Sequence, residues 1–299
     1  MSDMNQLGFW EVEVSPKVVN VASVPQRSPF RYPGGKTWLV PRVRQWVGSL
    51  PSRPQKFIEP FAGGAITGLT VAFENLADSV ILMEKDEQVA SVWQTIINTD
   101  GGAEWLANEI INFKLNLETA KDLMSARSTS TRKIALKTII QNRISHGGIL
   151  ADGAGFLKNG ENGKGILSRW YPETLKRRIL DISKIRKRIK FTRGDGFQAI
   201  KKYLYNPDVV FFIDPPYTAS KKKAGTRLYK YHDLNHEKLF ELMSKINGDF
   251  LMTYDDADEV RSLALKHRFE TRLVAMNNTH HATMSELLIG HDLSWVDKY

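Results

Sequence analysis

The chain has 299 residues, of which 42% are apolar, enough to bury the core of one large domain or of one domain with a smaller lobe. It contains no cysteine, so disulfides, thiolate metal sites and cysteine nucleophiles are all excluded. No run of about 18 apolar residues is present to cross a membrane, and the N-terminus shows no basic region followed by an apolar stretch. We therefore expect a cytoplasmic protein without a secretory signal.

The net charge of +9 is concentrated in one segment. Residues 121–193 hold 18 Lys and Arg against 5 Asp and Glu, a net of +13, so the remainder of the chain carries −4. A surface that faces nucleic-acid phosphates needs such a concentration, although a solvated helix face would also show it.

After an extension over residues 1–27, the chain predicts the first half of a doubly wound nucleotide-binding sheet. Short buried strands are expected at 56–59 and 79–84, and helices at 65–76 and 87–98. A glycine turn follows the first strand and acidic residues follow the second. This order is typical of an α/β fold.

Residues 100–187 interrupt this pattern. They are helix-rich and basic, and the glycine-dense stretch from His146 to Gly165 is too loop-like for a core layer, so we expect an inserted lobe with a flexible loop. Strands return at 189–193 and 208–213, the second apolar enough for a central strand covered on both faces. The remaining elements are expected at 236–246 (helix), 250–253 (strand), 257–267 (helix), 271–276 (strand) and 285–290 (strand).

The strand at 208–213 ends at Asp214-Pro215-Pro216-Tyr217, at the edge where open parallel sheets bind ligands. The prolines stiffen the backbone and leave its carbonyls available as acceptors. A planar group with an amino substituent fits this slot, because the amine can donate to the Asp214 carboxylate and the Pro215 carbonyl while the ring stacks on Tyr217. Two acceptors would direct the nitrogen lone pair at an electrophile. The alternative is a strand that ends in a proline-rich turn.

Two glycine turns indicate a binding site. In the segment from Phe30 to Lys36, Phe30 stands where a phosphate-binding loop needs glycine, so what remains is a turn that presents Lys36 to a carboxylate and Tyr32 to a cofactor. An ordinary turn is the alternative. Phe61-Ala62-Gly63-Gly64, after the first strand, lets a ligand approach the backbone, and the next helix N-terminus favours a negative group.

Acidic residues follow two other strands. Glu84 is placed to accept both hydroxyls of a ribose, with Asp86 as the less favoured substitute. Asp195 lies between Gly194 and Gly196, where it could accept from an adenine amino group or form only an Asx turn. The histidine spacings do not fit a zinc site, and no metal is expected.

Four motifs in one order, FRYPGGK, FIEPFAGG, VILMEKD and DPPY, resemble the Dam-like, α-type (D12 class) adenine-specific DNA N6-methyltransferases over residues 28–290. The resemblance implies an α/β fold with a doubly wound mixed sheet of the S-adenosylmethionine-dependent methyltransferase type. Residues 28–99 and 188–299 would form the catalytic domain, and residues 100–187 an inserted helical target-recognition domain. S-adenosylmethionine is the implied cofactor, and a flipped adenine in a specific double-stranded DNA sequence is the implied substrate. A restriction-modification system with a cognate restriction endonuclease is the implied context.

The resemblance also implies roles for individual residues. The catalytic residues would be Asp214, Pro215, Pro216 and Tyr217. The residues that bind the cofactor would be Tyr32, Lys36, Phe61, Gly63, Glu84, Asp195 and Asp214, with Glu84 standing where the family usually has Asp. The residues that contact DNA would be Arg143 and His146 in the insert, and Lys221, Lys222, Lys223 and Arg227 in a mobile loop after the slot.

Three other functions share parts of this pattern. A cytosine-N4 DNA methyltransferase needs the same slot, but those enzymes more often have Ser where this chain has Asp214. A glutamine-amide methyltransferase usually carries Asn there, and the basic insert would be unexplained. A DNA-binding protein that has lost catalysis is disfavoured by the intact slot.

Overall fold

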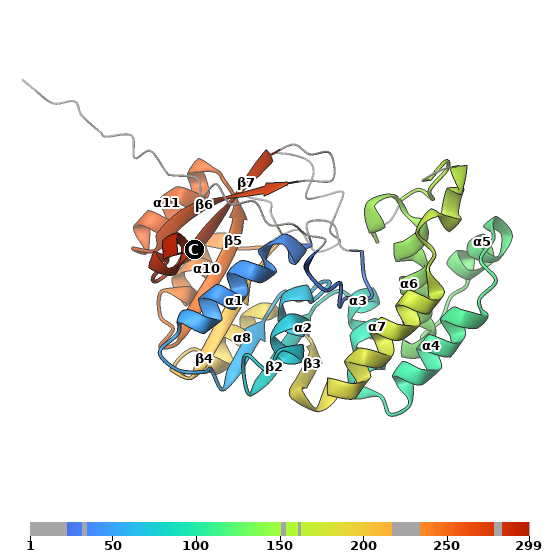
Figure 1. Cartoon of the computed structure of the whole chain (residues 1–299), viewed down its shortest axis with the longest axis horizontal. Coiled ribbons are helices and arrows are strands. Elements are labelled where there is room, and N and C mark those ends of the chain that lie inside the picture. Colours follow the sequence, from blue (N-terminus) through green and yellow to red (C-terminus); the bar gives the residue numbers. More distant parts are fainter. Residues whose placement is uncertain are drawn as a thin grey trace, which may run out of the picture.

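The computed structural model describes residues 23–31, 35–150, 154–160, 163–216, 234–277 and 283–298. Its centre is a seven-stranded sheet in the order β3-β2-β1-β4-β5-β7-β6 (Figure 1). The strands are β1 (Lys56–Glu59), β2 (Ser79–Glu84), β3 (Ile189–Arg193), β4 (Val209–Ile213), β5 (Asp249–Asp255), β6 (Glu270–Asn277) and β7 (Thr283–Gly290). The pairs from β3 to β5 are parallel and β7 is antiparallel to both its neighbours, so the expected doubly wound mixed sheet is confirmed.

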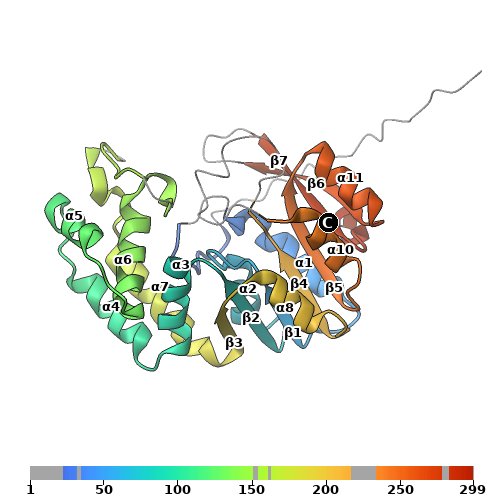
Figure 2. The same cartoon turned by 180° about the vertical axis from the view of Figure 1, so that it is seen from behind.

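Helices cover both faces of the sheet (Figures 1 and 2). The helices whose apolar residues share one core with the sheet are α1 (Val40–Ser49), α2 (Ile66–Phe73) and α3 (Glu87–Trp93). The helices of the opposite core are α8 (Gly196–Tyr203), α10 (His236–Met243) and α11 (Asp258–Lys266). In β4, Phe212 belongs to the first core while Phe211 and Ile213 belong to the second, because successive side chains of a strand point to opposite faces. That two-sided burial explains the unbroken apolar run of β4.

The inserted residues form a group of helices beyond the β3 edge (Figure 1). These are α4 (Gly102–Asn112), α5 (Leu117–Ser125), α6 (Thr131–Ile144) and α7 (Pro172–Ile185), with short turns η4 (His146–Gly148) and η6 (Gly165–Arg169) between α6 and α7. Leu106, Ile139 and Ile179 belong to the same apolar core as α1 to α3, so these helices are packed onto the sheet domain through one continuous core. We call this group the helical lobe.

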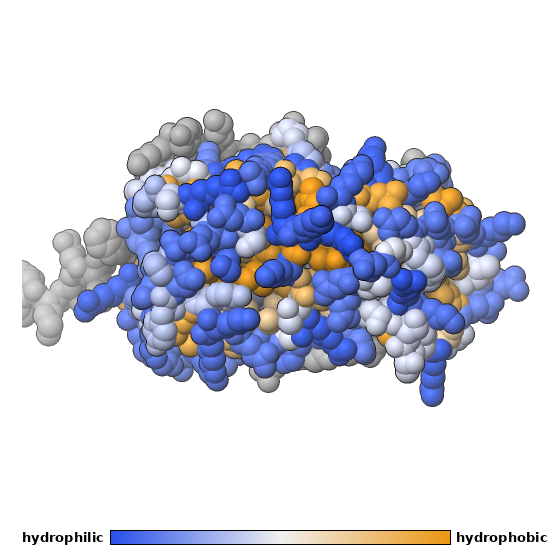
Figure 3. Space-filling model, turned by 90° about the horizontal axis from the view of Figure 1, so that it is seen from below, coloured by the Kyte–Doolittle hydropathy of each residue, from blue (hydrophilic) through white to orange (hydrophobic). Residues whose placement is uncertain are grey.

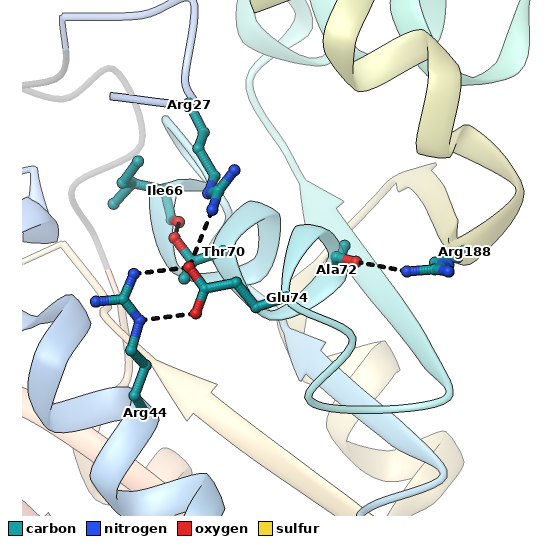
Figure 4. Close-up of polar contacts among 7 residues, drawn as sticks. All are labelled: Arg27, Arg44, Ile66, Thr70, Ala72, Glu74 and Arg188. Atoms are coloured by element: carbon teal, nitrogen blue, oxygen red, sulfur yellow. Dashed lines mark hydrogen bonds and ion pairs between the residues drawn. The ribbon is translucent and has the colours of Figure 1, made fainter. Parts of the chain in front are cut away.

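Helix α2 follows the glycine turn, and two arginine side chains contact Glu74 at the end of this helix (Figure 4). Glu74, just after α2, accepts from Arg44 Nε at 2.7 Å and Nη2 at 2.6 Å, and from Arg27 Nη2 at 2.9 Å. The hydrogen bonds from Arg44 are the main reason that the pKa of Glu74 is lowered. Arg27 precedes the FRYPGGK motif in the chain. Its contact with Glu74 therefore holds the segment before that motif against the end of α2.

Several predicted boundaries were wrong for local reasons. The helix expected to reach residue 76 ends at Phe73, because Asn75 adopts a left-handed φ of 56° and Leu76 N bonds back to Val71 O. By contrast, the helix expected over 87–98 has these bounds, although it is α-helical only to Trp93 and ends as a π-helical turn, η3 (Gln94–Asn98). The helix after residue 236 ends at Met243, and β5 is longer than its apolar centre.

The face seen from below is mainly hydrophilic, with small apolar patches between the polar side chains (Figure 3). Within the described ranges, no helix has both the length and the apolar character needed to span a bilayer.

Candidate active site

A cavity of about 530 Å³ lies at the carboxyl ends of β1, β2, β3 and β4, where open parallel sheets bind ligands. Its walls bring together segments that are far apart in the sequence. Among the residues that line it are Lys36, Glu59, Phe61, Gly63, Glu84, Asp195, Phe197, Asp214, Pro215 and Pro216. The predicted site residues within the described chain therefore meet at one cavity, with His146 the exception.

The turn after β1 is fixed by backbone geometry and by its neighbours. Gly63 has a φ of +46°, a conformation that glycine adopts without strain. Its N–H donates to Glu84 Oε2 at 2.8 Å, and its carbonyl accepts from Trp93 Nε1 at 2.9 Å. The turn is thus held to β2 and to α3, which leaves its backbone as a rigid wall of the cavity.

Glu84 holds this turn and the start of the next segment through hydrogen bonds to backbone amides. Its Oε1 accepts from the amides of Lys85 and Asp86, both at 2.8 Å, in addition to the Gly63 bond to Oε2. Burial raises its pKa, although these hydrogen bonds act in the opposite direction. A carboxylate has about four acceptor positions, so three are occupied and one is left. In this conformation one acceptor position of Glu84 stays open, and its contact with the hydroxyls of a ribose stays a prediction.

The two other acidic residues of this region cap helices. Asp86 accepts from Gln88 N and Val89 N at the start of α3, which accounts for it without a ligand. Asp195 accepts from Phe197 N at 2.9 Å at the start of α8, so it forms the Asx turn and still lines the cavity. A Cβ on Gly196 would lie 2.7 Å from Pro60 O, so glycine is required where the turns after β1 and β3 meet.

Asp214 belongs to a buried polar network. Its Oδ1 lies 3.0 Å from Lys36 Nζ and accepts from Thr253 Oγ1 at 3.0 Å. Lys36 Nζ also lies 2.9 Å from Glu286 Oε1, and both of these residues are buried. The lysine therefore binds carboxylates of the protein itself. Nearby, burial and the Asp214 charge raise the pKa of Tyr254, whose hydroxyl lies 2.9 Å from His236 Nδ1.

Comparison with protein families shows which family the chain belongs to. The family described as D12 class N6 adenine-specific DNA methyltransferase matches residues 32–278. The chain belongs to this family. No curated protein matches it.

Solved structures add little to this assignment. A precorrin-6y C5,15-methyltransferase from Geobacter metallireducens is 9% identical, with 94% of this chain and 92% of that chain covered and a TM-score of 0.35. The rRNA methyltransferase aviRa from Streptomyces viridochromogenes is 10% identical, with 85% and 84% covered and a TM-score of 0.40. Likenesses at this level carry no argument about function.

Membership of this methyltransferase family implies the use of S-adenosylmethionine, and the residues present fit that group. The cavity offers a glycine turn with a fixed backbone, a carboxylate with one open acceptor position at Glu84, and two aromatic rings. Phe61 and Phe197 both line it and meet edge to face at 6.4 Å between ring centroids. Within the described part of the chain, no group of three His, Asp or Glu could hold a metal ion.

Two buried acids in or near the cavity were not predicted. Glu59, the last residue of β1, accepts from Gly68 N at 2.9 Å, and burial raises its pKa well above the ordinary value, with the charges of Asp214 and Glu84 adding to the effect. Glu286 lies in β7 and pairs with Lys36. Each is the single acid of its strand and stands next to apolar residues, where a charge needs a partner, but the sequence does not identify that partner.

Of the residues predicted to contact DNA, the structure describes Arg143 and His146. Arg143 is 5% exposed, donates through Nη2 to Pro29 O and lines the cavity, and its DNA contact stays a prediction. His146 is exposed, and its DNA contact stays a prediction. The remaining predicted residues lie outside those that the structure describes: Tyr32, Tyr217, Lys221, Lys222, Lys223 and Arg227.

Proposed function

We propose that this chain transfers a methyl group from S-adenosylmethionine to the N6 amine of an adenine that is flipped out of a specific double-stranded DNA sequence. Family membership supports the reaction class. The observation that carries the proposal is the position of Asp214, Pro215 and Pro216 on the wall of the same cavity as the Gly63 turn and Glu84. An amine acceptor and a nucleoside-sized cofactor pocket then open onto one space.

The geometry supports a role for Asp214 in orienting the amine. Lys36 and Thr253 hold Oδ1, so the carboxylate plane is fixed before the substrate arrives. The amine donates one hydrogen to this carboxylate and one to the carbonyl of Pro215, which directs the nitrogen lone pair into the cavity. S-adenosylmethionine, when bound, supplies an electrophilic methyl group. The proton that the amine loses once the N–C bond has formed passes to the Asp214 carboxylate.

A base inside a duplex cannot reach a slot of this kind, so we propose that the adenine is extruded, at a cost of a few kcal/mol. The basic residues of 121–193 would offset that cost through phosphate contacts. The cognate endonuclease, the restriction-modification context and the cytoplasmic location stay predictions.

Transfer of tritium from labelled S-adenosylmethionine to DNA, followed by nucleoside analysis, tests the proposal. We expect label in N6-methyladenine with the wild type and none with Asp214→Ala. The matched control is Asp78→Ala, since Asp78 is an exposed carboxylate paired with Arg53 and away from the cavity. Label in N4-methylcytosine would favour the cytosine enzyme, and no label with the wild type would favour a DNA-binding protein without activity.

A further inference from the structure

The cavity has a second wall that the proposed chemistry does not use. Four arginines line it: Arg31 before the glycine turn, Arg143 at the end of α6, Arg169 in η6 and Arg178 in α7. We call them the arginine cluster. They come from the N-terminal segment and from the helical lobe, and the acidic residues of the cavity follow the strands of the sheet.

The cluster is built into the packing. Arg178 Nη1 donates to Ser28 O at 3.0 Å, and Arg143 donates to Pro29 O. Asn142, next to Arg143, accepts from Arg31 N and donates to Arg31 O, both at 2.8 Å. These bonds fix residues 28–31 against the helical lobe. The acceptors in these bonds are backbone carbonyls and a neutral side-chain amide, none of which carries a negative charge.

Polar atoms of the cluster remain unsatisfied. Within the part of the chain that the structure describes, Nε of Arg143 and Nε of Arg178 are buried without a hydrogen-bond partner. Arg143 is 5% exposed. A buried donor without an acceptor costs free energy, and more so when it is charged, so such a site favours an acceptor from outside the chain.

The charges also act on one another. Burial lowers the pKa of Arg143 to about 9, and the positive charges of Arg178, Arg31 and Arg169 add to this effect. Burial likewise lowers the pKa of Arg31 and of Arg178. None of the charges that shift these three pKa values within the described chain belongs to a carboxylate. An arginine side chain keeps its proton at neutral pH, so these guanidinium groups bring positive charge to this wall of the cavity.

We propose that the arginine cluster binds a phosphodiester of the DNA strand next to the flipped adenosine. This inference rests on the proposed function, because it places the nucleotide in the same cavity as Asp214. A nucleotide that leaves the duplex takes its two flanking phosphates toward the mouth of its pocket. Guanidinium groups match phosphate oxygens with paired N–H donors, and a dry setting strengthens these bonds.

The cluster would then link target binding to the catalytic motifs. Anion binding would neutralise the repulsion among the arginines and tighten the lobe on residues 28–31. That segment shortly precedes Lys36, the first residue of the 3-10 helix η2 (Lys36–Leu39), and Lys36 holds Asp214. A bound phosphate would therefore hold residues 28–31 against the helical lobe, close in the chain to the lysine that contacts the amine acceptor.

Binding of two small probes to the full chain tests the anion site without requiring methyl transfer. We expect adenosine 3′,5′-bisphosphate to bind the wild type at least about tenfold more tightly than adenosine, as charge-assisted hydrogen bonds predict. Arg178→Gln should largely lose this preference. Arg177→Gln is the matched control, because Arg177 is exposed on the same helix and does not line the cavity. An equal preference in the wild type and in Arg178→Gln would overturn the proposal.

Duplexes with a neutral methylphosphonate beside the methylated adenine locate the phosphate, once sequencing of modified DNA has identified the site. Neutralising one flanking position should weaken wild-type binding about tenfold and leave Arg178→Gln almost unchanged. Equal losses in both proteins would contradict the inference even if the wild type methylates DNA. If the wild type transfers no methyl group, the proposed function fails, while the probe experiment still decides the anion site.

Two further measurements distinguish a phosphate site from a folding defect and from a cofactor site. Arg178→Lys keeps the positive charge but loses the paired N–H donors of the guanidinium group, so it should retain part of the preference for the bisphosphate. Thermal unfolding shows whether each variant folds. If Arg178→Gln instead weakens binding of S-adenosylmethionine and keeps its preference for the bisphosphate, the cluster serves the cofactor carboxylate and the proposal is wrong.

Discussion

The Nζ atom of Lys36 lies 3.0 Å from Oδ1 of Asp214, so the first residue of η2 contacts the first residue of the DPPY motif. Burial by itself lowers the pKa of Lys36, but the carboxylates of Asp214 and Glu286 raise it above the ordinary value for lysine. The ammonium group therefore stays charged and lies between the buried carboxylate of Glu286 and the partly exposed carboxylate of Asp214. Lys36 acts on the proposed amine acceptor through this contact.

Lys36→Met tests how much the fold depends on this contact. The change leaves Asp214 and Glu286 facing each other without a cation, which should cost about 3–5 kcal/mol of unfolding free energy. The double variant Lys36→Met/Glu286→Gln should be less destabilised than Lys36→Met, because one carboxylate remains instead of two. Urea unfolding measures both, with Lys184→Met as the control for an exposed pair worth less than about 1 kcal/mol. A loss for Lys36→Met no larger than the control's would contradict the assignment.

Glu286→Gln tests positioning. Lys36 would keep its contact with Asp214, but its second partner would become a neutral acceptor without charge, so Asp214 should be held less firmly. We expect kcat to fall about tenfold to a hundredfold with little change in the affinity for S-adenosylmethionine, as misplacement of a reacting group predicts. Single-turnover kinetics and equilibrium binding of the cofactor separate these effects. A selective loss of cofactor affinity would show that Glu286 acts on the cofactor instead.

Glu59 gives the stability a dependence on pH. Its pKa is raised well above the ordinary 4.5 by burial, so the folded chain keeps the proton to a higher pH than the unfolded chain. Between these two pKa values the folded state binds more protons, and the free energy of unfolding falls as pH rises above about 4.5. Glu59→Gln keeps an acceptor for Gly68 N and does not titrate. Its stability should fall less than that of the wild type between pH 4.5 and 8, and parallel urea midpoints would argue against a raised pKa.

Two glycines in helices should respond to alanine in opposite ways. A Cβ at Gly68 would lie 2.6 Å from Glu59 Oε2 and 2.6 Å from Leu82 Cδ2, so Gly68→Ala should destabilise the fold by about 1–3 kcal/mol. A Cβ at Gly48 meets nothing within 4 Å, so Gly48→Ala in α1 should stabilise it by about 0.5–1 kcal/mol. Thermal unfolding of both variants provides the comparison, and effects of the same sign would show that the packing of α2 differs from this structure.

Glu84 should affect the cofactor and not the DNA. Glu84→Ala removes the open acceptor position and the bond from Gly63 N, so we expect affinity for S-adenosylmethionine to fall about tenfold to a hundredfold. DNA affinity and its salt slope should stay at wild-type values. Equilibrium binding of each ligand measures this, and an unchanged cofactor affinity would remove Glu84 from the binding site.

The sequence predicted the sheet better than the contacts around the cavity. Strands such as β4 have a local signal, since their apolar runs and the acids or glycines that follow them mark the carboxyl edge. The partner of Lys36 has no local signal, because Glu286 comes from an antiparallel strand far along the chain. The hydrogen bonds from Asn142 and Arg143 to residues 28–31 also have no local signal, because they join segments far apart in the chain. The Asp86 and Asp195 caps depend on where helices begin, which sequence patterns place less accurately than the helices themselves.

The central claim is that Asp214 directs methylation of an adenine amine in DNA, and sequencing of modified bases tests it most directly. DNA from cells that express the wild type should carry N6-methyladenine at one sequence, and DNA from cells that express Asp214→Ala should carry none. Modified cytosine in place of adenine, or N6-methyladenine that persists in the Asp214→Ala cells, would contradict the account.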